Sequence, residues 1–348
     1  MENSSNYSCE PGQWQDEPVM VLRDNQSGAI AMVAHELGSN CVFWAVRHQQ
    51  QEVPVIETPA SPAVLHNRAS RGGIPVLWPF PGRVRDAHYT YRGQDYHLPR
   101  TDKSGVHHIH GLALNAKWQV AAYGADDNGA FLVTTLRPAQ LSDEGRPSYP
   151  FDFVLSLRLV LKGQSLTYLV TLENKESQTA LPFSFGLHPY FRAPLVPTDS
   201  PSDPAARSHC LVRIPAATHW PTDGGIPNGP AQPVTPSQDF RDWKALGSQS
   251  FDDMYSGVLP TDGADGAFSL AGYRTPELGL EVQIRADPQF QNWVLFTPAE
   301  RASIAIEPYT SPPNAINSTP VGLPGSNLLE LAAGSSWQAQ VIMEVLSF

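Results

Sequence analysis

Two polar residues stand in apolar segments of this sequence and could carry out proton transfer. His188 lies in FSFGLHPYFRAP at 183–194, and Glu307 ends the apolar run SIAI at 303–306. Burial beside aromatic rings or contact with a carboxylate tunes the pKa of a histidine, which can then act as a general acid near neutral pH. A carboxylate at the end of a buried strand is costly unless it is paired or used, so Glu307 is the best candidate for a general base. The ordinary alternatives are a core histidine bonded to a backbone carbonyl and an exposed acid at a strand end.

Arg83 and His110 are candidates for binding a ligand. Arg83 follows GGIPVLWPFPG at 72–82, and a side chain on a backbone fixed by Gly and Pro is pre-organised for binding. Its alternative is an exposed arginine that begins a strand. His110 closes the run HHIH at 107–110, which lacks helical i, i+4 spacing and has no carboxylate or cysteine nearby, so we predict no metal site. We expect His110 to donate a hydrogen bond to a ligand, and the alternative is a surface histidine cluster.

An acidic pair is the last candidate. Asp252 and Asp253 lie in SFDDMYSGVL at 250–259. In a strand, neighbouring side chains point to opposite faces, so only one of the two can enter a site. The alternative is an Asp-rich turn.

The elements that position these residues are predicted to be strands. A period-2 pattern runs over 153–172, broken by the turn KGQ, and predicts a hairpin with one buried face. The 33 prolines and 26 glycines leave little room for long helices. Further strands are expected at 28–36, 41–47, 131–137, 280–286, 292–298, 303–307 and 337–345. The fold class is therefore all-β, a large antiparallel β-sandwich.

The strand patterns also indicate the domain organisation. They run from residue 28 to the end, which predicts a polar N-terminal segment at 1–27 and a single domain at 28–348. The Pro- and Ser-rich stretch at 193–209 and most of 217–250 are interpreted as loops inserted in that domain.

Composition excludes several classes of protein. The formal net charge of −11 disfavours nucleic acid as a partner. Cys9, Cys41 and Cys210 lack the spacing of a disulfide framework or a zinc site. The N-terminus does not resemble a signal peptide, and no apolar run reaches membrane-spanning length, so we expect a cytoplasmic protein without a membrane partner.

Taken together, the candidate segments resemble the aldose 1-epimerases (galactose mutarotases) and the related hexose-6-phosphate 1-epimerases. The resemblance runs from about residue 28 to the C-terminus, in the segments GRVRDAHYTYRGQDYHL, HHIHGLALNAKW, GLHPYF, FDDMYSG and IEPYTSPPNAIN. It implies the supersandwich form of the β-sandwich with an open sugar-binding cleft. It also implies interconversion of the α and β anomers of a free hexose, without metal or cofactor.

The resemblance implies a role for each candidate residue. His188 corresponds to the general acid and Glu307 to the general base. Arg83 and His110 correspond to residues that hold the ring oxygen and hydroxyls of the sugar. Asp252 corresponds to the acid that binds ring hydroxyls, with Asp253 as the alternative one residue later. The implied partner is a small-molecule sugar, an aldohexose or a sugar phosphate, and the chain is expected to be a monomer or homodimer.

The sequence leaves open the substrate, the class of activity and the residues that line the site. RGGIPVLWPF at 71–80 resembles the hexose-6-phosphate branch, whereas Leu114 and GRVRDAHYTYRG favour the free-sugar branch. A non-catalytic sugar-binding protein on the same fold is a further alternative, and a polysaccharide lyase or hydrolase is a remoter one. The residues that could form a phosphate patch are Arg68, Arg71, Arg83 and Arg85, and those that could line the apolar face of the sugar are Trp78, Tyr190 and Phe296.

Overall fold

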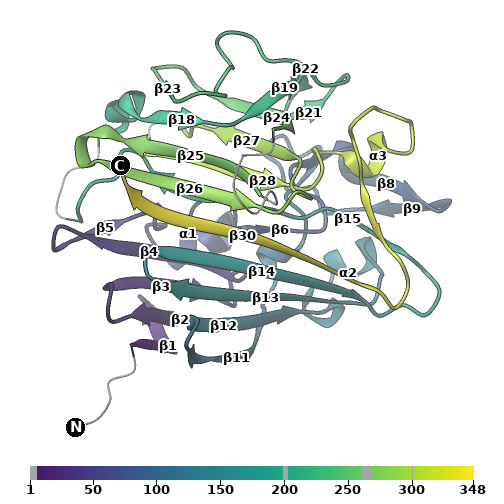
Figure 1. Cartoon of the computed structure of the whole chain (residues 1–348). Coiled ribbons are helices and arrows are strands. Elements are labelled where there is room, and N and C mark those ends of the chain that lie inside the picture. Colours follow the sequence, from purple (N-terminus) through teal and green to yellow (C-terminus); the bar gives the residue numbers. More distant parts are fainter. Residues whose placement is uncertain (1–5, 199–202, 260–267, 300) are drawn as a thin grey trace.

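The strongest alternating pattern of the sequence forms the centre of the largest sheet. The computed structural model describes residues 6–198, 203–259, 268–299 and 301–348, and in it β13 (Phe153–Lys162) and β14 (Ser165–Asn174) form the predicted hairpin. Among the described residues this sheet has nine strands, in the order β11-β12-β13-β14-β30-β26-β25-β18-β23 (Figure 1). The other seven are β11 (Gln119–Asp126), β12 (Gly129–Leu136), β30 (Ser336–Ser347), β26 (Leu280–Ala286), β25 (Ser269–Thr275), β18 (Leu211–Arg213) and β23 (Lys244–Ala245).

A second sheet packs against the first and carries the candidate residues. Eight strands are described in it: β22 (Gln232–Pro233), β19 (Ala216–Trp220), β24 (Asp252–Val258), β27 (Asn292–Phe296), β28 (Ser303–Tyr309), β16 (Gly186–Leu187), β6 (Val76–Leu77) and β17 (Tyr190–Arg192), which also pairs with β28. Ile304 and Ile306 of β28 share one apolar cluster with Val282 and Ile284 of the first sheet. Every residue of β28 is buried, which explains why its sequence does not alternate between apolar and polar residues.

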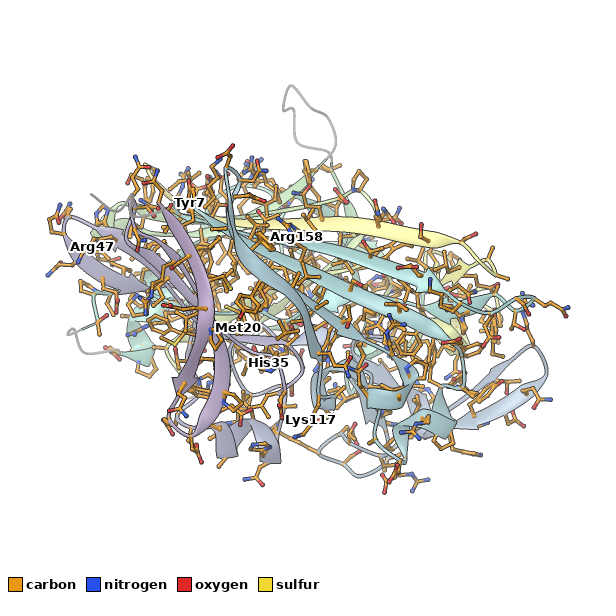
Figure 2. All side chains as sticks on the ribbon, turned by 90° about the horizontal axis from the view of Figure 1, so that it is seen from below. Tyr7, Met20, His35, Arg47, Lys117 and Arg158 are labelled. Atoms are coloured by element: carbon orange, nitrogen blue, oxygen red, sulfur yellow. The ribbon has the colours of Figure 1, made fainter. Side chains whose placement is uncertain are left out.

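A smaller sheet covers one edge of the first. Its described strands are β1 (Tyr7–Trp14), β2 (Glu17–Asp24), β3 (Ala29–Ala34), β4 (Asn40–His48) and β5 (Gln51–Pro54). β1, β2 and β3 contact β11, β12 and β13, and Figure 2 views these two layers from below, with Met20 on β2 and Arg158 on β13. β1 and β2 fall in the segment 1–27, where the sequence pattern predicted no strand. Residues 1–5 of that segment lie outside the described residues, as do 199–202 of the predicted loop at 193–209.

Short paired strands and helical turns complete the described chain. The pairs are β7 (Arg83–Val84) with β10 (His108–Ile109), β8 (His88–Tyr91) with β9 (Gln94–His97), β15 (Leu181–Phe183) with β29 (Leu329–Leu331), and β20 (Thr222–Asp223) with β21 (Ile226–Pro227). The α-helices are α1 (Pro62–Asn67), α2 (Gly145–Ser148) and α3 (Ala315–Ser318). The 3₁₀ helices are Arg85–Ala87, Ala113–Asn115, Pro138–Gln140, Pro204–His209 and Pro276–Leu278.

The prediction of an all-β antiparallel sandwich is confirmed. Each predicted strand range overlaps an observed strand, including β3, β4, β12, β26, β27, β28 and β30. The segment 217–250, interpreted as mostly loop, holds the greater part of β19 and the short strands β20 to β23. Across the described ranges, the helices are all too short or too polar to cross a membrane.

Candidate active site

The pairing register of the second sheet builds the floor of a cleft. Directly opposed residues of antiparallel strands point to the same face. Asp252 lies opposite Phe296, Phe296 opposite Ala305, and Ala305 opposite Tyr190, so the four form a row across β24, β27, β28 and β17. Asp252, Phe296 and Tyr190 line a cleft of about 560 Å³. This volume is typical of a small-molecule site.

The next position along the same strands brings His188 and Glu307 together. Gly186 of β16 pairs with Tyr309, and Tyr190 of β17 pairs with Ala305, both on β28. His188 lies midway between Gly186 and Tyr190, just as Glu307 lies midway between Tyr309 and Ala305, so the two face each other. His188 Nε2 is 3.3 Å from Glu307 Oε1, and both residues line the cleft. β16 ends at Leu187 and β17 begins at Tyr190, but the pairing register with β28 continues across the break.

Two tyrosines hold this pair. The hydroxyl of Tyr309 donates a hydrogen bond to Glu307 Oε2 at 2.7 Å. The hydroxyl of Tyr190 lies 3.1 Å from His188 Nε2, and the two rings stack with their centroids 4.3 Å apart. His188 is 4% exposed and Glu307 1%, so both functional groups are almost completely removed from bulk water.

Burial controls the protonation of the pair. It lowers the pKa of His188 well below its ordinary value, and the nearby His110 and the positive charge of Arg301 act in the same direction. Burial raises the pKa of Glu307 well above its ordinary value, opposed by the Tyr309 hydrogen bond and reinforced by Asp252. Burial therefore favours the uncharged pair, in which Glu307 holds the proton and the imidazole of His188 is neutral. A neutral imidazole with a carboxylic acid and an imidazolium with a carboxylate have the same total charge, and transfer across the 3.3 Å contact interconverts them.

The short β7–β10 pair places Arg83 next to His110. Arg83 is opposite Ile109, and the amide of His110 donates to the carbonyl of Gly82 at 2.8 Å. The amide of Gly82 in turn donates to His110 Nδ1 at 3.3 Å, so a neutral His110 carries its proton on Nε2. Burial lowers the pKa of His110 to about 3, assisted by the positive charge of Arg83. His110 is thus a neutral hydrogen-bond donor at physiological pH. Its φ of 68° is a left-handed conformation that is strained for a non-glycine residue.

Arg83 is held in the cleft by residues that sequence reasoning missed. Its Nε lies 3.7 Å from Oδ2 of Asp102. Although burial opposes the change, hydrogen bonds from the Ser104 hydroxyl and the His107 amide lower the pKa of Asp102, which keeps it ionised. A Cβ on Gly225, which also lines the cleft, would overlap Arg83 Nη1. The sequence of the Asp102 turn gives no sign of contact with Arg83, and Gly225 comes from the segment interpreted as an inserted loop.

The structure separates the two neighbouring acids. Asp252 lines the cleft and is exposed to it, and partial desolvation by the surrounding protein raises its pKa against the opposing effect of Arg83. The side chain of Asp253 does not line it, and its Oδ1 accepts a hydrogen bond from Gln238 Nε2 at 2.7 Å. Asp252 is therefore the acid that faces the candidate site.

The structure also sorts the two sets of residues that the sequence left open, those for the apolar face of the sugar and those for a phosphate patch. Tyr190 and Phe296 line the cleft, whereas Trp78 is fully buried against Tyr149 and Phe153 in the core. Among the predicted phosphate-patch residues, Arg68 and Arg83 line the cleft, and Arg71 and Arg85 are exposed outside its lining.

One further residue of the site could have been found from the sequence. Tyr309 follows Glu307 by two positions along β28, and alternate residues of a strand share a face. The predicted strand ended at 307, which left Tyr309 out. The three histidines of HHIH point to separate partners, and within the described ranges no group of three or more His, Cys, Asp or Glu could hold a metal ion.

Known proteins resemble this chain over most of its length. The family model described as aldose 1-epimerase matches residues 20–344. The protein YihR of Escherichia coli K12, described as uncharacterized, is 27% identical over 270 residues, covering 74% of each chain. A galactose mutarotase-like protein from Clostridium acetobutylicum superimposes with a TM-score of 0.82 at 21% identity, covering 98% of both chains. The galactose 1-epimerase from Lactobacillus acidophilus NCFM superimposes with a TM-score of 0.71 at 17% identity, also covering 98% of both.

These structural similarities identify the fold as the galactose mutarotase-like sandwich that the sequence predicted. The family model covers nearly the whole chain and includes every candidate residue of the cleft. On this match, the chain belongs to the aldose 1-epimerase family.

Proposed function

We propose that this protein is an enzyme that interconverts the α and β anomers of a free hexose. One observation carries the proposal: His188 Nε2 and Glu307 Oε1 are 3.3 Å apart on the buried floor of an open cleft. Ring opening of a hemiacetal needs a base for the C1 hydroxyl and an acid for the ring oxygen. These two oxygens are bonded to the same carbon, and a side-by-side acid and base match that arrangement.

The protons balance in each direction. Glu307, as a carboxylate, takes the proton of the C1 hydroxyl, while His188, as an imidazolium, gives its proton to the ring oxygen. The C1–O5 bond breaks, C1 becomes a carbonyl, and rotation about the C1–C2 bond presents its other face. Closure reverses both transfers, so Glu307 returns its proton to the carbonyl oxygen and His188 recovers its own. The pair starts and ends with the same single mobile proton.

The remaining polar groups of the cleft provide hydroxyl recognition. Arg83 and His110 are donors fixed by backbone hydrogen bonds and by Asp102, whereas Asp252 is an acceptor. Tyr190 and Phe296 offer apolar surface to the carbon-bound hydrogens of the ring. The division into donors, acceptors and apolar walls suits a small polyhydroxylated substrate.

Polarimetry tests the proposal directly. Freshly dissolved α-D-glucose and α-D-galactose are followed with the wild type and with Glu307→Gln, and the buffer rate is subtracted. We expect acceleration by the wild type and a loss of about 10²–10⁴-fold in the variant. The proposal is overturned if the wild type does not accelerate mutarotation of either sugar. Saturable sugar binding without a rate effect would then identify a non-catalytic binding protein.

A hexose 6-phosphate is the second candidate substrate, and Arg68 favours it. Arg68 lines the cleft and has no ion-pair partner in the part of the chain that the structure describes. Arg83, by contrast, is engaged with Asp102, and Arg71 and Arg85 lie outside the cleft lining. If the phosphate ester is the substrate, Arg68→Ala raises its KM by about tenfold relative to the KM of the free sugar. An equal effect on both substrates would assign Arg68 to the hydroxyl groups.

A further inference from the structure

The hydroxyl of Tyr309 donates a hydrogen bond to one of the two carboxylate oxygens of Glu307. It donates to Oε2 at 2.7 Å, while Oε1 faces His188 Nε2 at 3.3 Å. We infer that Tyr309 is a positioning residue that holds Oε2 and reserves Oε1 as the oxygen that accepts the substrate proton. This inference rests on the proposed function and adds a residue to it.

The Tyr309 ring is closely packed, and its hydroxyl points at Glu307. The residue is 2% exposed and belongs to an apolar cluster with Leu77, Leu114, Trp220, Met254 and Val294. Gly186, its partner across the β16–β28 pair, clears the space for the ring. A Cβ on Gly186 would lie 2.6 Å from Cδ1 of Tyr309 and 3.0 Å from Cε1. The absence of a side chain at 186 is therefore what lets the tyrosine reach Glu307.

The Tyr309 hydroxyl keeps its proton and can donate this hydrogen bond throughout the reaction. Burial and the neighbouring Glu307 charge raise the pKa of Tyr309 well above its ordinary value, so the phenol keeps its proton. A hydrogen bond to an ionised oxygen is stronger than one to a neutral carboxyl group, so Tyr309 favours the carboxylate form of Glu307. In the described chain, the other charged or titratable groups acting on Glu307 are His188 and Asp252, and Tyr190 lies close enough to feel its charge. Arg83 acts on Asp252, and Arg301 acts on His188 and Tyr190.

Removing the hydroxyl has a predictable effect on the pH–rate profile. Tyr309→Phe destabilises every state in which Glu307 is ionised, including the active imidazolium–carboxylate state. The sum of the two apparent pKa values of the pair then rises by roughly 1–2 units, whichever tautomer predominates. The active fraction falls at the same time, so we expect kcat to decrease roughly 10–100-fold with a smaller change in KM.

A matched control separates positioning from stability. Tyr149 is also fully buried, and its hydroxyl donates to the carbonyl of Pro182 at 2.8 Å, away from the cleft lining. Tyr149→Phe also removes a buried phenol hydrogen bond, here one to a neutral carbonyl, and is expected to leave the pH–rate profile unchanged. Gly186→Ala is the complementary variant, because it keeps the Tyr309 hydroxyl but displaces the ring, and it should move the profile in the same direction as Tyr309→Phe.

The decisive experiment pairs this profile with a measurement that needs no activity. Infrared titration of the protonated carboxyl band, assigned to Glu307 by its loss in Glu307→Gln, is recorded for the wild type and Tyr309→Phe. We expect the carboxyl band to persist to higher pH in the variant. An unchanged titration overturns the inference, whatever the kinetics show. A shifted titration in a protein that does not accelerate mutarotation would instead refute the proposed function and leave the Tyr309–Glu307 coupling in place.

Discussion

Replacing Glu307 with glutamine should lower activity by about 10²–10⁴-fold and stabilise the fold. Glu307 is 1% exposed, and burial raises its pKa well above its ordinary value of 4.5. The folded state therefore binds the Glu307 proton more tightly than the unfolded state does. The free energy of unfolding falls as the pH rises above 4.5, and it continues to fall until the folded-state pKa is reached. Glutamine has almost the same shape and never ionises, so the variant does not incur this loss.

The size of the effect follows from the pKa difference. Each pH unit between the unfolded and folded pKa values of Glu307 costs the wild type about 1.4 kcal/mol. At pH 8 the variant should therefore be more stable than the wild type, and the difference should grow as the pH rises from 4.5 towards the folded-state pKa of Glu307. At pH 4 the two should be nearly equal, because the carboxyl group is then neutral in both states. The Tyr309 hydroxyl can still donate to the amide oxygen of the new side chain, which limits any loss of hydrogen bonding.

Urea unfolding at pH 4, 6 and 8 measures this difference, alongside polarimetry on the same preparations. Glu281→Gln is the control, because Glu281 is 3% exposed but is paired with Arg274 at 2.7 Å. Breaking that pair should lower the free energy of unfolding by about 1–3 kcal/mol at pH 8. The reasoning is refuted if Glu307→Gln destabilises the protein at pH 8 as Glu281→Gln does. That result would make Glu307 a structural carboxylate, stabilised in its ionised form.

Two further variants test the electrostatics and geometry of the cleft. Asp252→Asn removes a negative charge that raises the pKa of Glu307, so the pH–rate profile should move to lower pH by about half a unit. The lost hydrogen-bond acceptor should raise KM about tenfold. A shift of the measured profile to higher pH would contradict this reasoning. Gly225→Ala places a Cβ against Arg83 Nη1 and should raise KM about tenfold with a smaller change in kcat. Gly93→Ala is its control in steady-state kinetics, because it has the same kind of positive φ (76° against 75°) but open space around the added Cβ. Equal effects of both substitutions would assign the loss to backbone strain.

The fold was predictable wherever one face of a strand is buried. The hairpin β13–β14 alternates because its inner side chains enter the core and its outer ones do not, and the sequence records that difference. β1 contains Pro11 and Gly12, and only its pairing with β2 organises those residues as a strand. Local patterns carry no information about such pairing, so these strands were missed.

The candidate site was predictable in its parts and not in its arrangement. Four candidates were each visible as polar residues in apolar or Gly- and Pro-rich segments of the sequence: His188, Glu307, Arg83 and His110. Asp102 and Gly225 were not predictable. Both lie in turns and affect the site only through Arg83, and the sequence of a turn does not show which distant side chain it contacts. Which of Asp252 and Asp253 faces the cleft depended on the register of β24 against β27.

The sequence by itself determined an antiparallel all-β chain and a short set of residues able to transfer protons and bind hydroxyl groups. It could do so because burial on one strand face and the chemistry of each side chain are local properties. Only the tertiary structure decided that His188 and Glu307, more than a hundred residues apart in the chain, meet at 3.3 Å. Their contact depends on the pairing of β16 and β17 with β28, and their protonation depends on burial between packed sheets. Both are properties of the assembled fold, because they arise from contacts between segments that are distant in sequence.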